Sequence, residues 1–176
     1  VIGSVLRARS GELWVATLGG LSRLSGNRFV NYTSRDGLGG DAVTALFEDT
    51  EGSLWIGTNG SGLNCLYRGH FTWFPPEKTS TPKTVYGILQ EKNDNLWLSS
   101  EKGIYRVSTK NLKEYANKGK GEIFVDHFGA ADGMQISEGS SGGHPAAWRM
   151  KDGTLWFATP KGVAWVDPMA SSATIQ

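Results

Sequence analysis

The chain has 176 residues and a formal net charge of +1, which is enough for one ordinary domain with its own core. Its single cysteine, Cys65, excludes a disulfide within the chain and a zinc site built from several cysteines. The near-zero net charge argues against a nucleic-acid partner, and no apolar run reaches the roughly 18 residues that a membrane-spanning helix needs.

Glycine and tryptophan are the unusual residues of this composition. The chain contains 24 glycines and 7 tryptophans, whereas only 20% of its residues are charged. This composition favours many short strands joined by tight turns. No stretch shows a helical period over ten residues or more, so we expect no helix of that length.

A motif centred on Leu-Trp occurs four times along the chain. Its tryptophans are Trp14, Trp55, Trp97 and Trp156, which are 41, 42 and 59 residues apart. Two positions after each tryptophan stands a small residue, against which a large ring can pack: Ala16, Gly57, Ser99 and Ala158. A glycine follows, in a position that favours a tight turn: Gly20, Gly62, Gly103 and Gly162.

Each unit is predicted to contain four short strands. An apolar strand precedes a polar turn, the Leu-Trp strand follows, a third strand begins after the glycine, and an outer strand ends the unit. The outer strand is clear at residues 28–32 and 70–74. In the third unit it is blurred, near residues 112–115, and residues 123–128 are the alternative.

A four-stranded antiparallel unit of 40 to 45 residues is the period of a β-propeller blade. We therefore predict an all-β partial propeller over residues 1–168, part of a larger, seven-bladed type of ring. The predicted segments are blades at about 1–33, 41–75, 83–128 and 144–168, a long loop insertion at 116–143, and a linker or closing strand at 169–176. An open part-ring exposes blade faces and strand edges, so self-association is expected.

The repeat resembles the two-component regulator propeller family. The sequence Leu-Trp-Ile-Gly-Thr-x-x-x-Gly-Leu, preceded by Glu-Asp-x-x-Gly and followed by Phe-x-x-Phe, lies within residues 47–74, and residues 132–168 resemble that family's final blade. Ser99-Ser100 departs from the Gly-Thr of the repeat. The resemblance covers nearly all of the chain.

The resemblance implies the extracytoplasmic, periplasmic sensor of an inner-membrane histidine kinase, often a hybrid kinase. Its partners would then be a small molecule or oligosaccharide and, in the parent chain, the kinase and the rest of the propeller. The alternatives are a protein-interaction or dimerisation scaffold and, less favoured, a propeller lyase or hydrolase. The fragment itself is interpreted as a non-enzyme, and the resemblance assigns the histidine kinase to the parent protein.

The candidate ligand site lies on the ring face formed by the connections from the second to the third strand and from the outer strand to the next blade. These connections, with the 116–143 insertion, are the longer ones. The candidate ligand-binding residues are Arg35, Asp36, Asn59, Tyr86, Glu138, His144 and Lys161. The competing interpretation is structural: Asp36-Gly37 and Asp132-Gly133 form turns, Tyr86 lines the channel, and His144 bonds a loop carbonyl.

No catalytic residues, metal site or cofactor site is predicted. The three histidines, His70, His127 and His144, lack metal-ligand spacing, and no phosphate-binding or dinucleotide motif is present. Cys65 lies on a predicted strand and is interpreted as a small core residue.

Overall fold

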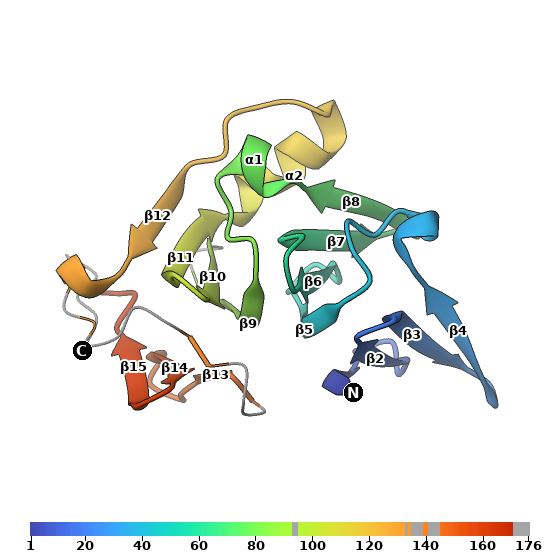
Figure 1. Ribbon diagram of the computed structural model, residues 1–176, viewed down its shortest axis with the longest axis horizontal. Helices are drawn as coiled ribbons and strands as arrows, with labels where there is room; N and C mark the ends of the chain where they lie inside the picture. The colour runs from blue at the N-terminus through green and yellow to red at the C-terminus, as the bar shows by residue number, and fades with distance from the viewer. Residues whose placement is uncertain (93–94, 133, 135–138, 141–144, 171–176) are drawn as a thin grey trace.

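The computed structural model describes residues 1–92, 95–132, 134, 139–140 and 145–170. Within these ranges the chain forms successive antiparallel sheets, each built from consecutive strands in chain order. The sheets follow one another around an arc, with the first strand of each blade innermost (Figure 1). The predicted all-β propeller architecture is confirmed.

The strand bounds follow the Leu-Trp repeat. Blade 1 contains β1 (Ile2–Arg7), β2 (Leu13–Thr17), β3 (Gly20–Ser25) and β4 (Arg28–Tyr32). Blade 2 contains β5 (Val43–Glu48), β6 (Leu54–Thr58), β7 (Leu63–Tyr67) and β8 (His70–Phe74). Blade 3 contains β9 (Val85–Gln90), β10 (Asn95–Ser100), β11 (Gly103–Ser108) and β12 (Val125–Phe128). The described part of blade 4 contains β13 (Ala147–Arg149), β14 (Leu155–Thr159) and β15 (Gly162–Val166).

The tryptophan of each of the first three blades packs against the next blade. Trp14 lies with residues of blade 2, Trp55 with residues of blade 3, and Trp97 with residues of blade 4. Strand β6 is buried at every position because blades cover both of its faces, whereas β2 is buried only at alternate positions. Blade 1 therefore has one covered face and one face without a neighbour in the described residues.

Glycines are required where two blades approach closely and where the chain turns. A Cβ atom on Gly57 would lie 2.9 Å from the Cβ of Val85 on the neighbouring blade, so only glycine allows this spacing. The glycines that follow the Leu-Trp strands have positive φ angles, as the sequence predicted, namely Gly20 (125°), Gly62 (76°), Gly103 (130°) and Gly162 (152°).

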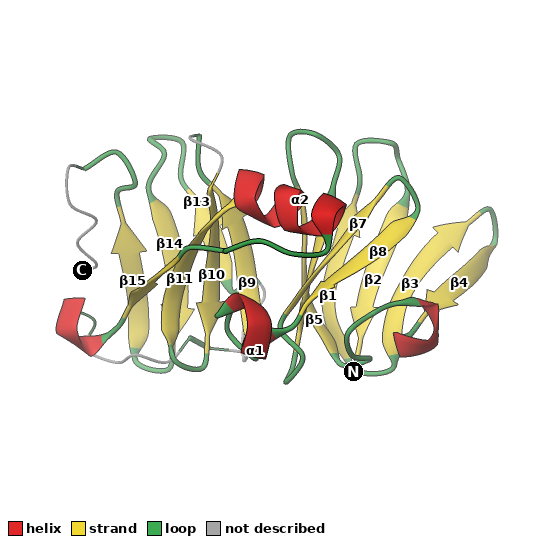
Figure 2. Ribbon diagram, turned by 90° about the horizontal axis from the view of Figure 1, so that it is seen from above, coloured by secondary structure: helices red, strands yellow, loops and turns green. Residues whose placement is uncertain are grey.

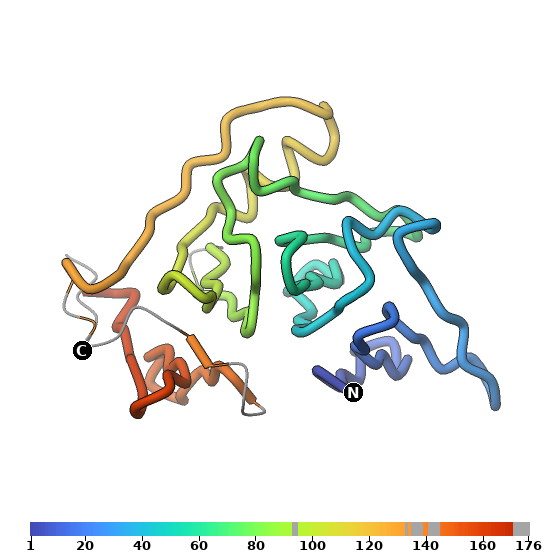
Figure 3. Tube along the Cα trace, viewed as in Figure 1, coloured from blue at the N-terminus to red at the C-terminus, as the bar shows by residue number. Residues whose placement is uncertain are grey.

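The third unit contains a helix that the sequence analysis did not predict. Helix α2 (Thr109–Lys118) lies between β11 and β12, and the chain then crosses to β12 along the outer edge (Figure 3). Its polar composition and single fully buried leucine, Leu112, gave no clear apolar period. The Ser108 side chain caps its first turn, and Gly119 ends it with a φ of 66°.

The outer strand of blade 3 is β12, inside the alternative range 123–128, and residues 112–115 are helical. The 116–143 segment is consequently not one loop, since it contains the end of α2, all of β12 and a short 3-10 helix, η2 (Ala130–Asp132). Figure 2 shows α2 at one rim of the arc and α1 (Pro76–Thr79) at the opposite rim. The expectation that the whole 116–143 insertion lies on the ring face of the candidate ligand site was wrong for residues 116–118, which end α2 at the opposite rim.

Candidate functional site

The rim that carries α1 holds the connections in which the sequence analysis placed a ligand. Arg35 and Asp36 lie there in η1 (Ser34–Asp36), between blades 1 and 2. Asp36 accepts hydrogen bonds from the backbone N–H of Thr33 (2.8 Å) and its hydroxyl (3.1 Å), and Gly37 follows with a φ of 107°. Asp36 thus forms a capped turn, and Arg35 in the same turn is exposed.

Asn59 belongs to a line of hydrogen bonds that crosses from blade 2 to blade 3 on this rim. The Thr84 hydroxyl donates to Asn59 Oδ1 (3.3 Å), and the Thr84 N–H donates to Glu101 Oε2 (3.2 Å). Tyr86 is half-buried on the innermost strand β9, and Lys161 is exposed in the turn before β15. Glu138 and His144 lie outside the described residues, so five of the seven candidates are placed.

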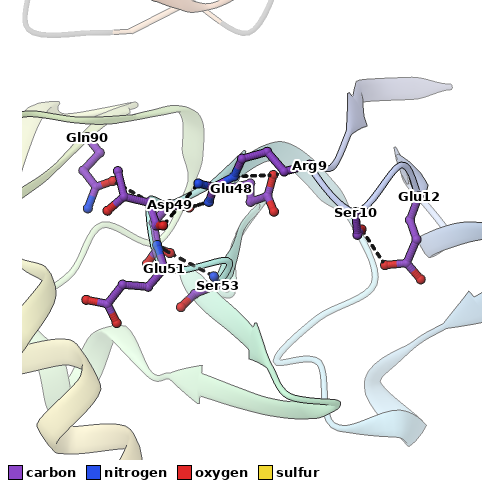
Figure 4. Close-up of polar contacts among 9 residues, drawn as sticks. Arg9, Ser10, Glu12, Glu48, Asp49, Glu51, Ser53 and Gln90 are labelled. Atoms are coloured by element: carbon purple, nitrogen blue, oxygen red, sulfur yellow. Dashed lines mark hydrogen bonds and ion pairs between the residues drawn. The ribbon is translucent and has the colours of Figure 1, made fainter.

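The opposite rim carries a polar network that the sequence analysis missed. Arg9, in the turn after β1, reaches across to blade 2 (Figure 4). Its backbone N–H donates to Glu48 Oε2 (2.8 Å), and its guanidinium donates to the carbonyls of Thr50 (3.1 Å) and Asp49. These bonds latch the first turn of blade 1 to the equivalent turn of blade 2.

The latch recurs between blades 2 and 3. The Thr50 N–H, which occupies the position of the Arg9 N–H, donates to Gln90 Oε1 (3.2 Å). Gln90 in turn occupies the position of Glu48, at the end of the first strand of its blade. In blade 4 the position of Glu48 and Gln90 is occupied by Arg149, whose guanidinium approaches the backbone carbonyl of Gln90 (3.5 Å).

A buried carboxylate anchors the tryptophan in both inner blades. Asp49, fully buried, accepts the indole N–H of Trp55 (3.0 Å) and the backbone N–H of Ser53 (2.8 Å). Glu91 accepts the indole N–H of Trp97 (2.8 Å) in the same way. Burying an indole N–H and a carboxylate is favourable here because each satisfies the other.

Helix α2 contributes a charge to this anchor. Lys113 Nζ lies 3.1 Å from Asp49 Oδ2 and 2.9 Å from Glu51 Oε2. Burial alone would raise the pKa of Asp49, but the hydrogen bonds from Trp55 and Ser53 and the charge of Lys113 outweigh burial and hold that pKa below its ordinary value. The two carboxylates likewise outweigh burial at Lys113 and raise its pKa.

In blades 1 and 3 an arginine covers the tryptophan ring. In blade 1 the Arg23 guanidinium lies 5.7 Å from the Trp14 ring centroid and 6.0 Å from that of Tyr32, and it pairs with Glu12 at 3.0 Å. In blade 3 Arg106 lies 5.5 Å from Trp97 and 5.8 Å from Phe128, and pairs with Asp126 at 2.7 Å.

Blade 2 has a cysteine where these arginines stand. Cys65 is the cross-strand partner of Trp55, as Arg23 is of Trp14 and Arg106 of Trp97. The aromatic pair is retained, since the rings of Trp55 and Phe74 lie 5.9 Å apart. Beside Cys65, between blade 2 and α2, the structure has a cleft of about 480 Å³, which we call the α2 cleft.

The α2 cleft has an apolar floor and a polar mouth. Its floor includes Cys65, Phe74 and Leu112, and its mouth includes groups that can donate hydrogen bonds, namely Tyr67, Arg68, His70, Lys113 and Asn117. Burial raises the pKa of the Cys65 thiol to about 12, so it is a neutral core group, consistent with its predicted role. A cleft of this volume is within the range of small-molecule sites.

The sequence contained a signal for this cleft. Aligning the repeats on the glycine that begins the third strand (Gly20, Gly62 and Gly103) places Cys65 under Arg23 and Arg106, although the helix that forms the other wall has no counterpart in the described residues of the other units. Among the described residues, no group of three or more metal-ligating side chains comes together. No helix in the described ranges is long and apolar enough to cross a membrane.

Residues 37–60 match the family model of the two component regulator propeller, which confirms the resemblance for this repeat. No curated protein matches the sequence. The match covers 24 residues and includes the Leu-Trp strand of blade 2.

Solved structures share the fold over almost the whole chain. A protein described as the extracellular domain of the hybrid two component system BT3049 from B. thetaiotaomicron has a TM-score of 0.77 and 19% identity, covering 99% of this chain and 22% of that one. A domain described in the same terms, BT4673 from B. thetaiotaomicron, has a TM-score of 0.71 and 20% identity, covering 99% and 24%.

An enzyme shares the fold as well. The virginiamycin B lyase from Staphylococcus aureus has a TM-score of 0.66 and 16% identity, covering 99% of this chain and 55% of that one. The chain thus spans about a quarter or less of the length of the sensor domains. At these identities the similarity shows the propeller fold alone.

Proposed function

We propose that this propeller is the extracytoplasmic ligand-sensing part of a two-component sensor or hybrid histidine kinase, responding to an oligosaccharide or another small molecule. The observation that carries the proposal is the two-component regulator propeller repeat at residues 37–60, set in a fold shared with extracellular domains of hybrid two-component systems. In such an assembly the kinase and further blades would be partners within the parent chain.

The rim that carries α1 supports a sugar-binding role. Arg35 and Lys161 are exposed on this rim, and Asn59 contributes an amide to the chain of polar groups that ends at Glu101. Cationic and amide side chains at the edge of a rigid scaffold are suited to hydroxyl groups of a sugar. Tyr86 lies near the start of β9, the innermost strand of blade 3, at the end of that strand that follows the α1 connection.

The test is a thermal-shift screen of this chain against oligosaccharides, followed by a reporter assay in the parent sensor. At least one oligosaccharide is expected to raise the Tm, because a ligand that binds only the folded state stabilises it. Arg35→Gln, Asn59→Ala and Lys161→Gln should each reduce the shift. Lys110→Gln, an exposed change on α2 at the opposite rim, is the matched control. An unchanged response in all three variants would remove this rim from the proposal.

A second candidate, self-association, is favoured by the uncovered faces of the end blades. Large apolar side chains are exposed on blade 1 (Ile2, Val5, Phe29) and on blade 4 (Trp148, Val163). Apolar residues gathered on sheet faces favour association. Light scattering on the purified chain should therefore show a dimer or larger species, and a monomer at high concentration would contradict it.

A further inference from the structure

We propose that the α2 cleft is a binding site for a hydroxylated, ring-bearing carboxylate, such as a sugar acid or a phenolic acid. The site is separate from the residues on the α1 rim. Its use by the cell rests on the proposed sensory function, but its occupancy can be measured without any signalling.

The first step of the argument is the missing arginine. In blades 1 and 3 an arginine covers the pair formed by the tryptophan and the outer-strand aromatic residue, and a carboxylate holds it there. In blade 2 the short side chain of Cys65 leaves that space open, and α2 closes it from one side only. Between blades 1 and 2, where Arg23 is present, the structure has a smaller cleft of about 360 Å³.

The second step is the loss of the carboxylates that held the arginine. Ser53 stands at the position of Glu12, two residues before the tryptophan, and Thr72 pairs with Cys65 as Asp126 pairs with Arg106. Both acidic positions have become hydroxyl groups in blade 2. A bound cation would have no dedicated counter-ion there, whereas hydroxyl groups can bond to polar substituents on a ring.

The third step is the charge that lines the cleft. Its charged side chains are Arg68, Lys113 and Glu51, and Glu51 is paired with Lys113 at 2.9 Å. Arg68 stacks on the Tyr67 ring at 5.1 Å and makes no ion pair within the described residues. A guanidinium with free donors at the mouth of a cleft favours a carboxylate, which it can bind with two parallel hydrogen bonds.

The fourth step is the depth and polarity of the floor. Phe74 and Leu112 are fully buried beneath the cleft, and Cys65 is neutral, so the floor suits the carbon face of a ring. The Ser53 hydroxyl is buried and has no hydrogen-bond partner other than the neighbouring Cys65 thiol. A hydroxyl group on the ligand would satisfy it.

The experiment is isothermal titration calorimetry of this chain with glucuronate and with 4-hydroxybenzoate. Saturable binding is expected for at least one of the two acids. The uncharged counterparts, glucose and 4-hydroxybenzamide, should bind at least about ten-fold more weakly, because they lack the carboxylate that bonds Arg68. Binding by glucuronate alone identifies a sugar acid, and binding by 4-hydroxybenzoate alone identifies a phenolic acid.

Two variants locate the site. The double variant Cys65→Arg with Thr72→Asp rebuilds the arrangement of Arg106 and Asp126 inside the cleft, and it should abolish binding. Its control is Val30→Asp, which adds the same acid at the equivalent outer-strand position of blade 1. Arg68→Gln, an exposed change that leaves the fold intact, should weaken binding about ten-fold. Arg28→Gln, exposed on the outer strand of blade 1, is its control.

The outcomes separate this site from the α1 rim. Absence of binding by both acids overturns the proposal, as does equal binding of the uncharged counterparts. Wild-type affinity in both the filled double variant and Arg68→Gln also overturns it. A response lost in the Arg35, Asn59 or Lys161 variants, with binding of the acids unchanged, affects the proposed function of the other rim only.

Discussion

Blades 2 and 3 carry the same tryptophan anchor, but different groups cover the pair formed by the tryptophan and the outer-strand aromatic residue. In blade 3 one side chain, Arg106, covers Trp97 and pairs with Asp126. In blade 2 that arginine is absent, and α2, supplied by the next blade, contributes Leu112 as cover and Lys113 as a charge. A repeat can thus lose a structural side chain and gain a cleft, provided that a neighbouring unit covers the aromatic pair.

The two solutions differ in how far they depend on the rest of the molecule. Arg106 and its partners belong to one sheet, whereas the anchor of blade 2 joins residues of two blades. We therefore expect changes around Trp55 to weaken the contact between blades 2 and 3, and changes around Arg106 to have local effects. The following predictions test this difference.

Trp55→Ala should have the largest effect, lowering the free energy of unfolding by about 3–5 kcal/mol. The Trp55 ring is fully buried between two blades, and its removal leaves a cavity and deprives Asp49 of the indole N–H donor. Trp156→Ala is the comparison, because that ring is only half-buried in the last blade, and it should cost less than half as much. Urea denaturation measures both, and equal losses would contradict the comparison.

Asp49→Ala should lower the free energy of unfolding by about 2–3 kcal/mol near pH 7, because it leaves the buried Trp55 indole N–H without its acceptor and Lys113 with Glu51 as its one remaining ion-pair partner among the described residues. The folded-state pKa of Asp49 is lowered, so its contribution is present above the unfolded pKa of about 3.9 and is lost as the pH falls through the folded pKa. The difference between wild type and variant should therefore shrink in acid. A difference that persists at low pH would contradict the ionised anchor.

Arg106→Ala should cost about 1 kcal/mol, since it removes a partly exposed ion pair and a contact over two rings. Arg23→Ala in blade 1 should cost about the same, because its surroundings are equivalent. Thermal unfolding of the two variants provides the measurement. A much larger loss at Arg106 would mean that its role extends beyond its own sheet.

The Cys65 thiol should be almost unreactive in the folded chain and reactive in the unfolded chain. It is 6% exposed, and its pKa is raised to about 12, so almost none is thiolate near pH 8. Ellman's reagent should consequently react very slowly with the folded chain and rapidly in concentrated urea. Fast reaction in the native state would show that the α2 cleft opens to the solvent more widely than the structure indicates.

The fold could be predicted because its evidence is local and repeated. The Leu-Trp strand, the small residue after it and the turn glycine recur in every unit, and each has a packing or backbone reason that needs no knowledge of distant residues. Helix α2 was missed because its ten residues contain one fully buried apolar side chain, Leu112, which gives no period to detect.

The candidate site was predictable only in part. Asp36-Gly37 was recognised as a possible turn from its own residues, because a capped turn is a short-range structure. The latch from Arg9 to Glu48 and the ion pair of Lys113 with Asp49 join residues 39 and 64 positions apart. Nothing in either local sequence specifies such a partner.

The sequence by itself determined the repeat, the strands and the resemblance to two-component regulator propellers, because these follow from short motifs with fixed spacing. It also contained the substitution of Cys65 for arginine. Only the tertiary structure decided that this substitution opens a cleft, since the second wall comes from α2 in the next blade. Side chains from different blades become neighbours through the curvature of the arc, and that curvature is a property of all the blades packed together.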